Sequence, residues 1–333
     1  MQFSRILVRA TNWVGDAVMS LPALRALRTR FPEARISVLA RPWVADLYAR
    51  EPFADEVIAY TAGRGAKDFA GKWRDAAELR ARKFDCAILL QNAFDAALLA
   101  WLARIPRRIG YNRDGRGLLL TDAVPVPTPG EIPLHQRFYY LELLRRAGIL
   151  DGFPAADAVR LEGAAAASDG ETWVGVSPGA AYGSAKRWPA DRFAEAAVEV
   201  AAGLGASVAL FGSAGERTLC EEVELLIGSR ARVANHAGKT SLREFIDLAA
   251  GCRVFLTNDS GAMHIASALG VPTVAVFGAT DHIATGPAGE RWRIVREPVE
   301  CSPCLLRECP IDHRCMTRVT AGRVAREALE LLK

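Results

Sequence analysis

Short apolar runs rich in β-branched residues alternate with helically spaced apolar residues along almost the whole chain, and this alternation limits the fold most. In the first half we expect strands at 5–10, 36–40, 57–60 and 86–90, and helices at 16–30, 44–50, 69–83, 96–103 and 136–147. In the second half we expect strands at 173–177, 207–211, 254–257 and 273–277, and helices at 190–204, 216–227, 242–250, 261–269 and 321–332. Strands that alternate with helices are typical of a parallel sheet covered on both faces.

The alternation stops between residues 151 and 170, where Ala, Gly and Asp dominate, and this segment is typical of a linker. We therefore predict an α/β fold of two doubly wound, Rossmann-like domains, 1–160 and 161–333, that face each other across a cleft. Ligands of such sheets bind at the carboxyl ends of the strands, so the loops there are candidate sites. The last helix could pack on either domain.

The composition narrows the class of protein. Half of the 333 residues are hydrophobic and 24% are charged, which excludes a disordered or fibrous chain. No apolar run approaches the roughly 18 residues of a membrane span, and the first residues lack the apolar stretch of a signal peptide. Seven cysteines without an export signal favour reduced thiols over a disulfide framework. These features predict a cytoplasmic protein.

The net charge of +4 is unevenly distributed along the chain. Residues 1–150 carry 23 Lys and Arg against 15 Asp and Glu, a net +8, whereas the remainder carries 19 against 23, a net −4. A basic first half favours an anionic partner, such as a phosphate or an anionic membrane surface. The alternative is that most of these arginines lie on solvated helix faces.

Two common nucleotide-binding signatures are absent from the sequence. No strand is followed by G-x-G-x-x-G, the dinucleotide-binding fingerprint. The run Gly238-Lys239-Thr240 resembles the end of a P-loop, but Val233 stands where that loop needs glycine. These absences argue against a dehydrogenase and against an NTPase.

Three loops carry residues suited to chemistry. The first joins the first strand to the first helix and contains Gly15 and Asp16. A carboxylate there could accept a proton from an attacking hydroxyl, or it could simply be the N-cap of the helix.

The second loop, 177–189, is rich in small residues and presents Lys186 and Arg187 just before a helix. Backbone N–H groups and a point charge suit a diphosphate, although the two cations could also be solvated. The third loop, 257–266, ends a strand and begins a helix whose first N–H groups form an anion site. Asp259 and Ser260 could bind a ligand or cap this helix, and His264 could reach a phosphate or belong to the core.

Four of the cysteines, with His313 among them, lie close together near the end of the sequence at Cys301, Cys304, Cys309 and Cys315. Thiols at such short spacings could hold a structural zinc. The spacing matches no standard zinc finger, so reduced thiols in an irregular loop are the alternative. We expect the other three cysteines, which fall in strand or helix patterns, to be core residues: Cys86, Cys220 and Cys252.

Together these motifs resemble glycosyltransferase family 9, the ADP-heptose:lipopolysaccharide heptosyltransferases, which have the GT-B fold. The resemblance rests on residues 13–25 (WVGDAVMSLPALR), 178–189 (PGAAYGSAKRWP) and 257–264 (TNDSGAMH), and it extends from the first strand to the last helix. The Ala-Lys-Arg-Trp-Pro form and residues 90–94 (LQNAF) are most similar to the heptosyltransferase II subfamily, which adds the second heptose of the inner core. The four-cysteine segment occurs in only some members of the family.

The resemblance implies a role for individual residues. It makes Asp16 the catalytic base and Lys186 the ligand of the donor phosphates, with Asp259 and His264 at the donor heptose and diphosphate. By looser alignment, Thr240 contacts adenine and Glu216 contacts ribose. The full expected donor set is Ser184, Lys186, Arg187, Glu216, Thr240, Asp259, Ser260, Gly261 and His264. The expected acceptor set is Asn12, Trp13 and Asn92.

The resemblance also implies the reaction and its partners. The expected enzyme is an inverting transferase from ADP-L-glycero-D-manno-heptose to heptosyl-Kdo2-lipid A, cytoplasmic and peripheral at the inner face of the inner membrane. No nucleic acid is expected as a partner. No Asp-x-Asp motif occurs in the chain, so no catalytic metal or other cofactor is indicated. The basic first half fits a polyanionic acceptor, and some of its basic residues, such as Arg64, Lys67, Arg107, Arg108 and Arg113, are expected near the cleft.

Three alternatives to this function stay open at the sequence level. One is a heptosyltransferase of another specificity, which adds the first or third heptose. A GT-B nucleotide-sugar epimerase would share the fold and donor site but would need no basic acceptor face. A non-catalytic module that binds a nucleotide or a metal would depend on the cysteine segment instead.

Overall fold

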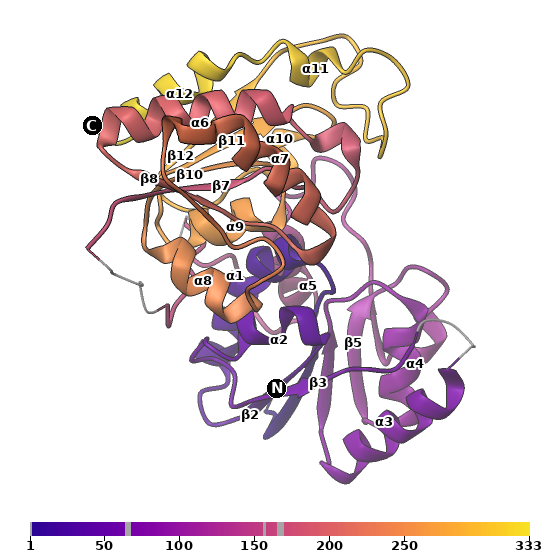
Figure 1. Cartoon of the computed structure of the whole chain (residues 1–333). Helices are drawn as coiled ribbons and strands as arrows, with labels where there is room; N and C mark the ends of the chain where they lie inside the picture. Colours follow the sequence, from indigo (N-terminus) through magenta and orange to yellow (C-terminus); the bar gives the residue numbers. More distant parts are fainter. Residues whose placement is uncertain (1, 64–67, 156–157, 165–169) are drawn as a thin grey trace. The chain divides into compact units, whose positions relative to one another are not determined.

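A computed structural model describes residues 2–63, 68–155, 158–164 and 170–333 of the chain (Figure 1). The chain divides into two compact units, Met1–Ala156 and Asp157–Lys333. Each unit contains one six-stranded sheet in which all neighbouring strands run parallel.

The first unit begins with β1 and alternates strands with helices. Its strands are β1 (Arg5–Arg9), β2 (Arg35–Ala40), β3 (Glu56–Ala59), β4 (Cys86–Leu89), β5 (Arg107–Tyr111) and β6 (Asp122–Val124). Its helices are α1 (Val14–Arg30), α2 (Pro42–Tyr48), α3 (Phe69–Ala81), α4 (Phe94–Leu102) and α5 (Arg137–Arg146), with a short 3₁₀ turn, η2 (Gly117–Leu119).

The second unit repeats this plan. Its strands are β7 (Trp173–Ser177), β8 (Ser207–Leu210), β9 (Val233–Asn235), β10 (Cys252–Asn258), β11 (Thr273–Phe277) and β12 (Trp292–Arg296). Its α-helices are α6 (Ala190–Leu204), α7 (Arg217–Ile227), α8 (Leu242–Ala250), α9 (Gly261–Ala268), α10 (His282–Thr285), α11 (Arg314–Thr317) and α12 (Ala321–Glu330). The 3₁₀ turns are η3 (Ser184–Lys186), η4 (Ala214–Glu216) and η5 (Gly228–Arg230).

The two sheets have the same topology. The first has the order β3-β2-β1-β4-β5-β6, and the second, read from its β9 edge, has the order β9-β8-β7-β10-β11-β12. This is the strand order of a Rossmann fold, in which the chain reverses direction across the sheet between its first and fourth strands. The fold prediction of two Rossmann-like α/β domains is therefore confirmed. The two switch points lie between β1 and β4 and between β7 and β10.

Each sheet is buried on both faces, as expected for parallel strands joined by helices. In the second unit, one core joins the strands to α6, α7 and α12 and includes Phe193 and Val324. A separate core under α8 and α9 includes Phe255 and Ala266. In the first unit, α3 and α4 share a core with Leu7 and its neighbours, while α1 packs against α5.

All of the helices predicted from the sequence exist, with ends that differ by a few residues. Helix α1 begins at Val14, two residues before the expected start. The sequence prediction missed four strands: β5, β6, β9 and β12. Three of these are edge strands, where fewer apolar residues are needed. The fourth, β5, contains Arg107, which forms an ion pair with Asp122 of β6 across 2.7 Å.

Two residues of the segment expected to be a linker, Val159 and Leu161, and the last helix associate with the second unit. The backbone N–H of Val159 donates to the carbonyl of Ala288, and that of Leu161 donates to the carbonyl of Ala268. Helix α12 packs along α6, as Figure 1 shows. Of the two places left open for this helix, the second unit is the one it occupies. Among the described residues, none of the helices combines the length and the apolar character needed to cross a bilayer.

Candidate active site

Nearly all of the residues singled out from the sequence lie at the carboxyl edges of the two sheets. Asn12, Trp13 and Asp16 follow β1, and Asn92 follows β4. In the second unit, the donor loop (residues 178–188) follows β7, and Asp259 follows β10. Both groups therefore lie at a switch point, where doubly wound sheets bind ligands.

Asp16 lies in the first turn of α1, but it does not cap the helix. The N-cap residue is Trp13, and it makes no side-chain cap hydrogen bond. The capping alternative considered for Asp16 is therefore wrong. Tyr140 of α5 instead donates its hydroxyl to Asp16 Oδ1 across 2.9 Å. The carboxylate is half-buried and is oriented by a helix more than a hundred residues away in sequence.

Tyr140 is itself buried, with 3% of its surface exposed. Burial and, next, the negative charge of Asp16 raise the pKa of Tyr140 well above its ordinary value. The tyrosine therefore remains a protonated donor at any pH at which the enzyme could work. This contact fixes the Asp16 carboxylate at the end of β1.

The loop before α1 is also held by an arginine and a tryptophan. Arg9 Nη2 donates to Asn12 Oδ1 across 2.9 Å, and Trp43 Nε1 donates to the carbonyl of Asn12 across 2.8 Å. Trp13, by contrast, leaves 52% of its surface exposed. The loop thus has a fixed backbone and presents one exposed aromatic ring.

Asn92 is positioned by the residue next to Tyr140. Its Nδ2 donates to the hydroxyl of Tyr139 across 2.8 Å, and its Oδ1 accepts from Arg116 Nη2 across 2.9 Å. Consecutive residues of α5 therefore hold the predicted base and a predicted acceptor residue. Helix α5 is the element that connects the two loops of this switch point.

Three arginines at this edge of the first sheet are buried without a carboxylate partner among the described residues. Arg9, Arg41 and Arg116 have 3%, 8% and 0% of their surfaces exposed. They donate to backbone carbonyls and to the side-chain oxygens of Asn12 and Asn92. Burial lowers the pKa of Arg9 and of Arg116 to about 10 each. Arg9 and Arg116 therefore remain charged at neutral pH, and both contribute a positive potential to this edge.

The basic residues expected to lie near the cleft have different environments. Arg107 pairs with Asp122, and Arg108 donates to the carbonyls of Ile105 and Leu119, so both are bound within the unit. Arg113 lies beside Tyr139, whose hydrogen bond raises the pKa of the guanidinium, and it is half-exposed. The other two, Arg64 and Lys67, lie outside the described residues.

In the second unit the structure brings Lys186 and Asp259 together. Lys186 Nζ lies 2.5 Å from Asp259 Oδ2, and their side chains are 12% and 5% exposed. Thr280, just after β11, also donates its hydroxyl to Asp259 Oδ2. Removing one member of such a buried pair leaves an uncompensated charge. The two residues predicted to contact the donor diphosphate and heptose thus form one ion pair at the β7–β10 switch point.

Helix α9 begins directly after this pair. Ser260 is its N-cap residue, but the side chain makes no cap hydrogen bond and lies 3.2 Å from Thr257 Oγ1 instead. Asp259 is engaged by Lys186 and Thr280, so neither residue caps the helix with its side chain. The N-terminus of α9, beginning at Gly261, carries the positive end of the helix dipole. His264 is buried within the helix, with 5% exposed.

The remaining donor-loop residues lie around Lys186. Ser184 begins the turn η3 and is exposed. Arg187 Nη2 lies 3.4 Å from the carbonyl of Ala180, and its buried Nε has no hydrogen-bond partner in the described part of the chain. An orphaned buried donor beside a small-residue loop is suited to an anionic ligand, which would satisfy it.

Glu216 and Thr240 lie on neighbouring loops at the same edge. Glu216 accepts the backbone N–H and the hydroxyl of Ser213, each across 2.8 Å, and so forms a capping box. A Cβ at Gly179 would lie 2.1 Å from Glu216 Oε1, so this carboxylate touches the donor loop. Thr240 is half-buried and precedes the N-cap of α8. Glu216 therefore stabilises the start of η4 in addition to the ligand-binding role predicted for it.

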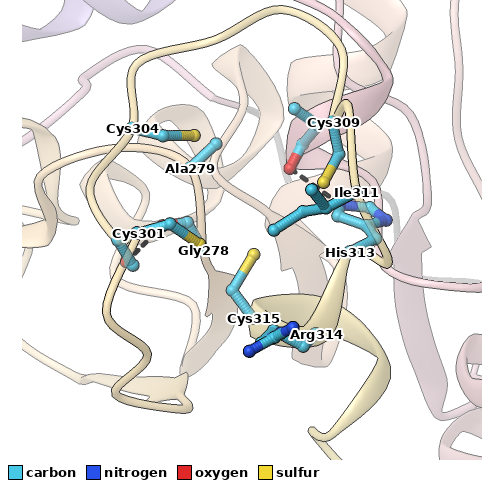
Figure 2. Close-up of a pocket in the computed structure, with 11 residues that line it drawn as sticks. Gly278, Ala279, Cys301, Cys304, Cys309, Ile311, His313, Arg314 and Cys315 are labelled. Atoms are coloured by element: carbon cyan, nitrogen blue, oxygen red, sulfur yellow. Dashed lines mark hydrogen bonds between the residues drawn. The ribbon is translucent and has the colours of Figure 1, made fainter.

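The four late cysteines line one small pocket (Figure 2). The cysteine loop (residues 300–313) runs from β12 to α11, and the pocket also contacts Gly278, Ala279 and Ala185. Burial, followed by the three neighbouring thiols, raises the pKa of Cys315 to about 11. In the described residues no group of three or more His, Cys, Asp or Glu side chains is arranged to hold a metal ion.

The other three cysteines are buried free thiols, as predicted. Burial raises the pKa of Cys86, Cys220 and Cys252 to about 12 each. They are core residues with no thiolate character at neutral pH.

Three side chains that hold site residues in place were not predicted from the sequence: Tyr140, Tyr139 and Thr280. The two tyrosines lie in a helix whose pattern predicts only packing. No local signal distinguishes a buried tyrosine that binds a distant carboxylate from one in the core. Thr280 follows a predicted strand, and its place at the carboxyl edge could have marked it as a candidate.

Comparisons with known proteins show the family to which this chain belongs. The family model described as glycosyltransferase family 9 (heptosyltransferase) matches residues 73–314. Lipopolysaccharide heptosyltransferase 2 of Salmonella typhimurium is 33% identical over 88% of this chain and 88% of its own.

Solved structures are similar over almost the whole chain. Escherichia coli ADP-heptose lps heptosyltransferase II superposes with a TM-score of 0.82 at 30% identity, covering 98% of both chains. The E. coli heptosyltransferase WaaC with ADP superposes with a TM-score of 0.77 at 19% identity, covering 98% of this chain and 99% of its own. At that identity the second likeness shows the fold alone.

Proposed function

The chain belongs to glycosyltransferase family 9, the heptosyltransferases, and from that membership we propose that it transfers heptose from an ADP-heptose donor to a heptosylated Kdo–lipid A acceptor. It is a glycosyltransferase of the heptosyltransferase II type. The observation that carries the proposal is the buried Lys186–Asp259 pair at the β7–β10 switch point, within the region that the family model matches.

The second unit binds the donor in this proposal. Lys186 and the N-terminus of α9 receive the diphosphate, because a cation and free backbone N–H groups together suit phosphate oxygens. Asp259 and His264 contact the heptose, and Glu216 and Thr240 contact the nucleoside. Ser184, Arg187, Ser260 and Gly261 complete the donor set. The buried Nε of Arg187 has no hydrogen-bond partner among the described residues and is suited to donate to a phosphate oxygen of the donor.

The first unit binds the acceptor through Asn12, Trp13 and Asn92. The three buried arginines, Arg9, Arg41 and Arg116, give this edge a positive potential without placing a cation on the surface. Such a potential draws a polyanionic headgroup toward the site from a distance. A headgroup of this kind would place the enzyme at the inner face of the inner membrane.

The proposed reaction inverts the anomeric configuration. An acceptor hydroxyl attacks the anomeric carbon, the new C–O bond forms, and the bond to the diphosphate breaks. Asp16 takes the hydroxyl proton as the bond forms, a contribution typically worth about 10²–10⁴-fold. Lys186 and the N–H groups of α9 stabilise the charge that gathers on the departing ADP.

A transfer assay tests the proposal directly. The purified protein is incubated with ADP-heptose and with three truncated acceptors that carry zero, one or two core heptoses, and the products are read by mass spectrometry. We expect addition of one heptose to the singly heptosylated acceptor alone. Transfer to the acceptor without heptose would identify a different specificity. Release of free sugar without transfer, or turnover of a UDP-sugar, would contradict the proposal.

We also propose that the pocket lined by Cys301, Cys304, Cys309 and Cys315 takes one structural zinc ion. Four thiols line one small pocket and are of the type that zinc prefers; in the described residues they are not gathered closely enough to hold an ion, so binding would have to draw them together. The thiolates rather than the thiols bind zinc, and the pKa of Cys315 is raised to about 11, so binding must displace its proton.

Metal analysis of the purified protein tests this second proposal. We expect about one zinc ion per chain, and an affinity that falls as the pH is lowered because protons compete for the thiolates. A chelator should lower the melting temperature, and the Cys304→Ser variant should lose the effect. A metal-free protein of equal activity and stability would leave only the interpretation as reduced thiols.

A further inference from the structure

The cysteine loop is hydrogen-bonded to the donor loop at three places. Tyr182 donates its hydroxyl to the carbonyl of Leu305 across 2.8 Å, and the backbone N–H of Ala185 donates to the carbonyl of Arg307 across 2.9 Å. His313 Nε2 lies 3.0 Å from the carbonyl of Ala185. Two segments more than a hundred residues apart in sequence are therefore joined along their backbones.

The contact is too close for any side chain between the two backbones. A Cβ built on Gly183 would lie 2.1 Å from the carbonyl oxygen of Arg307. A separation below about 3 Å cannot be kept, so glycine is required at this position as long as the loops touch. The donor loop thus has its conformation set by the cysteine loop.

The cysteine loop also brings a cation from outside the donor loop to its Tyr182. The ring centroid of Tyr182 lies 4.9 Å from Lys186 Nζ and 5.3 Å from Arg307 Cζ. Asp259 balances the charge of Lys186. In the described part of the chain Arg307 has no carboxylate within ion-pair distance, so the charge of the guanidinium beside Tyr182 is available to an anion.

We propose that the cysteine loop is a working part of the donor site: Arg307 contributes a further cation, beside Lys186 and Arg187, for the diphosphate of a nucleoside diphosphate sugar, and the three backbone-directed contacts hold Lys186 in place. This inference rests on the proposed function, because it assumes that Lys186 binds the donor phosphates. Guanidinium groups bind phosphate oxygens in pairs, which a lysine cannot do. A metal or any other change at the four thiols then acts on donor affinity through the same loop.

Calorimetry with ADP on the full-length protein tests the role of Arg307. We expect Arg307→Gln to weaken ADP binding by about 3- to 10-fold, a modest change because the side chain is exposed to water. The KM for ADP-heptose should rise by a similar factor, with the KM for the acceptor unchanged. The matched control is Arg326→Gln on the exposed face of α12, which should leave both values unchanged. Equal ADP affinity in Arg307→Gln and in the unaltered protein would overturn the proposed cation.

A second variant tests the coupling between the loops. Gly183→Ala places a Cβ against the Arg307 carbonyl and should force the loops apart, which weakens ADP binding without lowering the melting temperature of the whole protein. The loss in the double variant with Arg307→Gln should be smaller than the sum of the two single losses, because both act through one contact. Additive losses, or no loss in Gly183→Ala, would contradict the coupling.

The controls separate this inference from the proposed function. If the unaltered protein does not bind ADP, the proposed function fails. If it binds ADP, and Lys186→Met weakens binding while Arg307→Gln and Gly183→Ala do not, only the role of the cysteine loop is wrong.

Discussion

The two units use the same strand order to build two chemically different sites. At the β1–β4 switch point the cations Arg9 and Arg116 are buried against carbonyl and amide oxygens, and the carboxylate of Asp16 is held by a tyrosine. At the β7–β10 switch point the principal cation and carboxylate are paired with each other, Lys186 with Asp259. The topology decides where a ligand binds, and the loops decide what kind of ligand it is.

The difference has a physical consequence for ligand binding. A carboxylate that is oriented by a hydroxyl rather than by a cation is suited to accept a proton, as a base must. A lysine paired with a carboxylate is stabilised before the ligand arrives, and its other two N–H groups can donate hydrogen bonds to phosphate oxygens. The first arrangement is suited to proton transfer and the second to the binding of an anion.

The replacement Asp16→Asn tests the first site and should have the largest effect. We expect kcat to fall at least about 10²-fold, because the amide cannot accept the proton of the acceptor hydroxyl. The melting temperature should change little, since Asp16 is not the N-cap and its favourable interaction with the helix dipole is typically worth about 0.3–1 kcal/mol. Steady-state kinetics and thermal unfolding measure the two quantities. Activity within a few-fold of the unaltered enzyme would remove Asp16 from the chemistry.

The replacement Lys186→Met tests the second site. We expect ADP to bind roughly 10- to 100-fold more weakly, as for the loss of a hydrogen bond to a charged group. The single variant leaves the Asp259 carboxylate buried beside the hydroxyl of Thr280 and without its cation, so stability should also fall. A double variant with Asp259→Asn removes both charges and should regain stability without regaining ADP affinity. Recovery of ADP affinity in the double variant would show that Lys186 serves the fold alone.

Adjacent tyrosines of α5 allow a sharper test within the first site. Tyr140→Phe removes the donor to Asp16 and should lower kcat by about 10-fold, as expected for one hydrogen bond to a charged group. Tyr139→Phe is the matched control, because it loses the contact to Asn92 and should raise the KM for the acceptor instead. The same effect in both variants would indicate that the two tyrosines only pack.

The pH profile provides an independent check on this contact. The folded pKa of Tyr140 is raised, so its protonated form is favoured by folding and this stabilisation is lost only as the pH rises through the raised value. The profile of kcat should therefore show no tyrosine-dependent loss up to about pH 10, the ordinary pKa of a tyrosine. An alkaline decline below that pH that disappears in Tyr140→Phe would contradict the assignment.

The fold and the places of the sites could be predicted from the sequence better than the contacts within the sites. The β–α alternation and the loop motifs are local, so residues such as Asp16, Lys186 and Asp259 could be marked from the sequence alone. The Lys186–Asp259 pair joins residues 73 positions apart, and Tyr140 reaches Asp16 across 124 positions. No spacing rule connects such residues, because the parallel topology brings them together only after the sheet has formed.

The same reason explains why charge counting could not tell which basic residues are free to meet an anionic ligand. The surplus of +8 in the first half suggested surface arginines as acceptor ligands. Arg107 and Arg108 are instead bound within the unit, and the charges of Arg9 and Arg41 are buried. Composition reports the number of charges, but only the fold decides which of them a carboxylate neutralises.

The smallest expected effect concerns Arg113, the half-exposed cation beside Tyr139 and therefore near Asn92. An exposed charge is screened beyond a Debye length of about 8 Å at physiological salt, so a single reversal changes binding only modestly. We expect Arg113→Glu to raise the KM for the acceptor by about 2- to 5-fold with kcat nearly unchanged, the pattern of lost uniform binding. Added salt should reduce this difference and should raise the KM for the acceptor more than that for ADP-heptose, whose phosphates we propose to bind the buried Lys186.

The control for Arg113→Glu is Arg80→Glu, at the exposed end of α3. Helices of a parallel α/β unit run opposite to the strands, so the end of α3 lies toward the amino edge of the sheet, away from the proposed acceptor residues. Both variants change the net charge equally, and a long-range effect of net charge alone would raise the KM in both. A change confined to Arg113→Glu would assign the effect to the carboxyl edge of the first sheet. Equal salt sensitivity for the two substrates would instead show that the charge asymmetry is ordinary surface composition. The two switch points would then differ only in their buried contacts, Tyr140 with Asp16 in the first unit and Lys186 with Asp259 in the second.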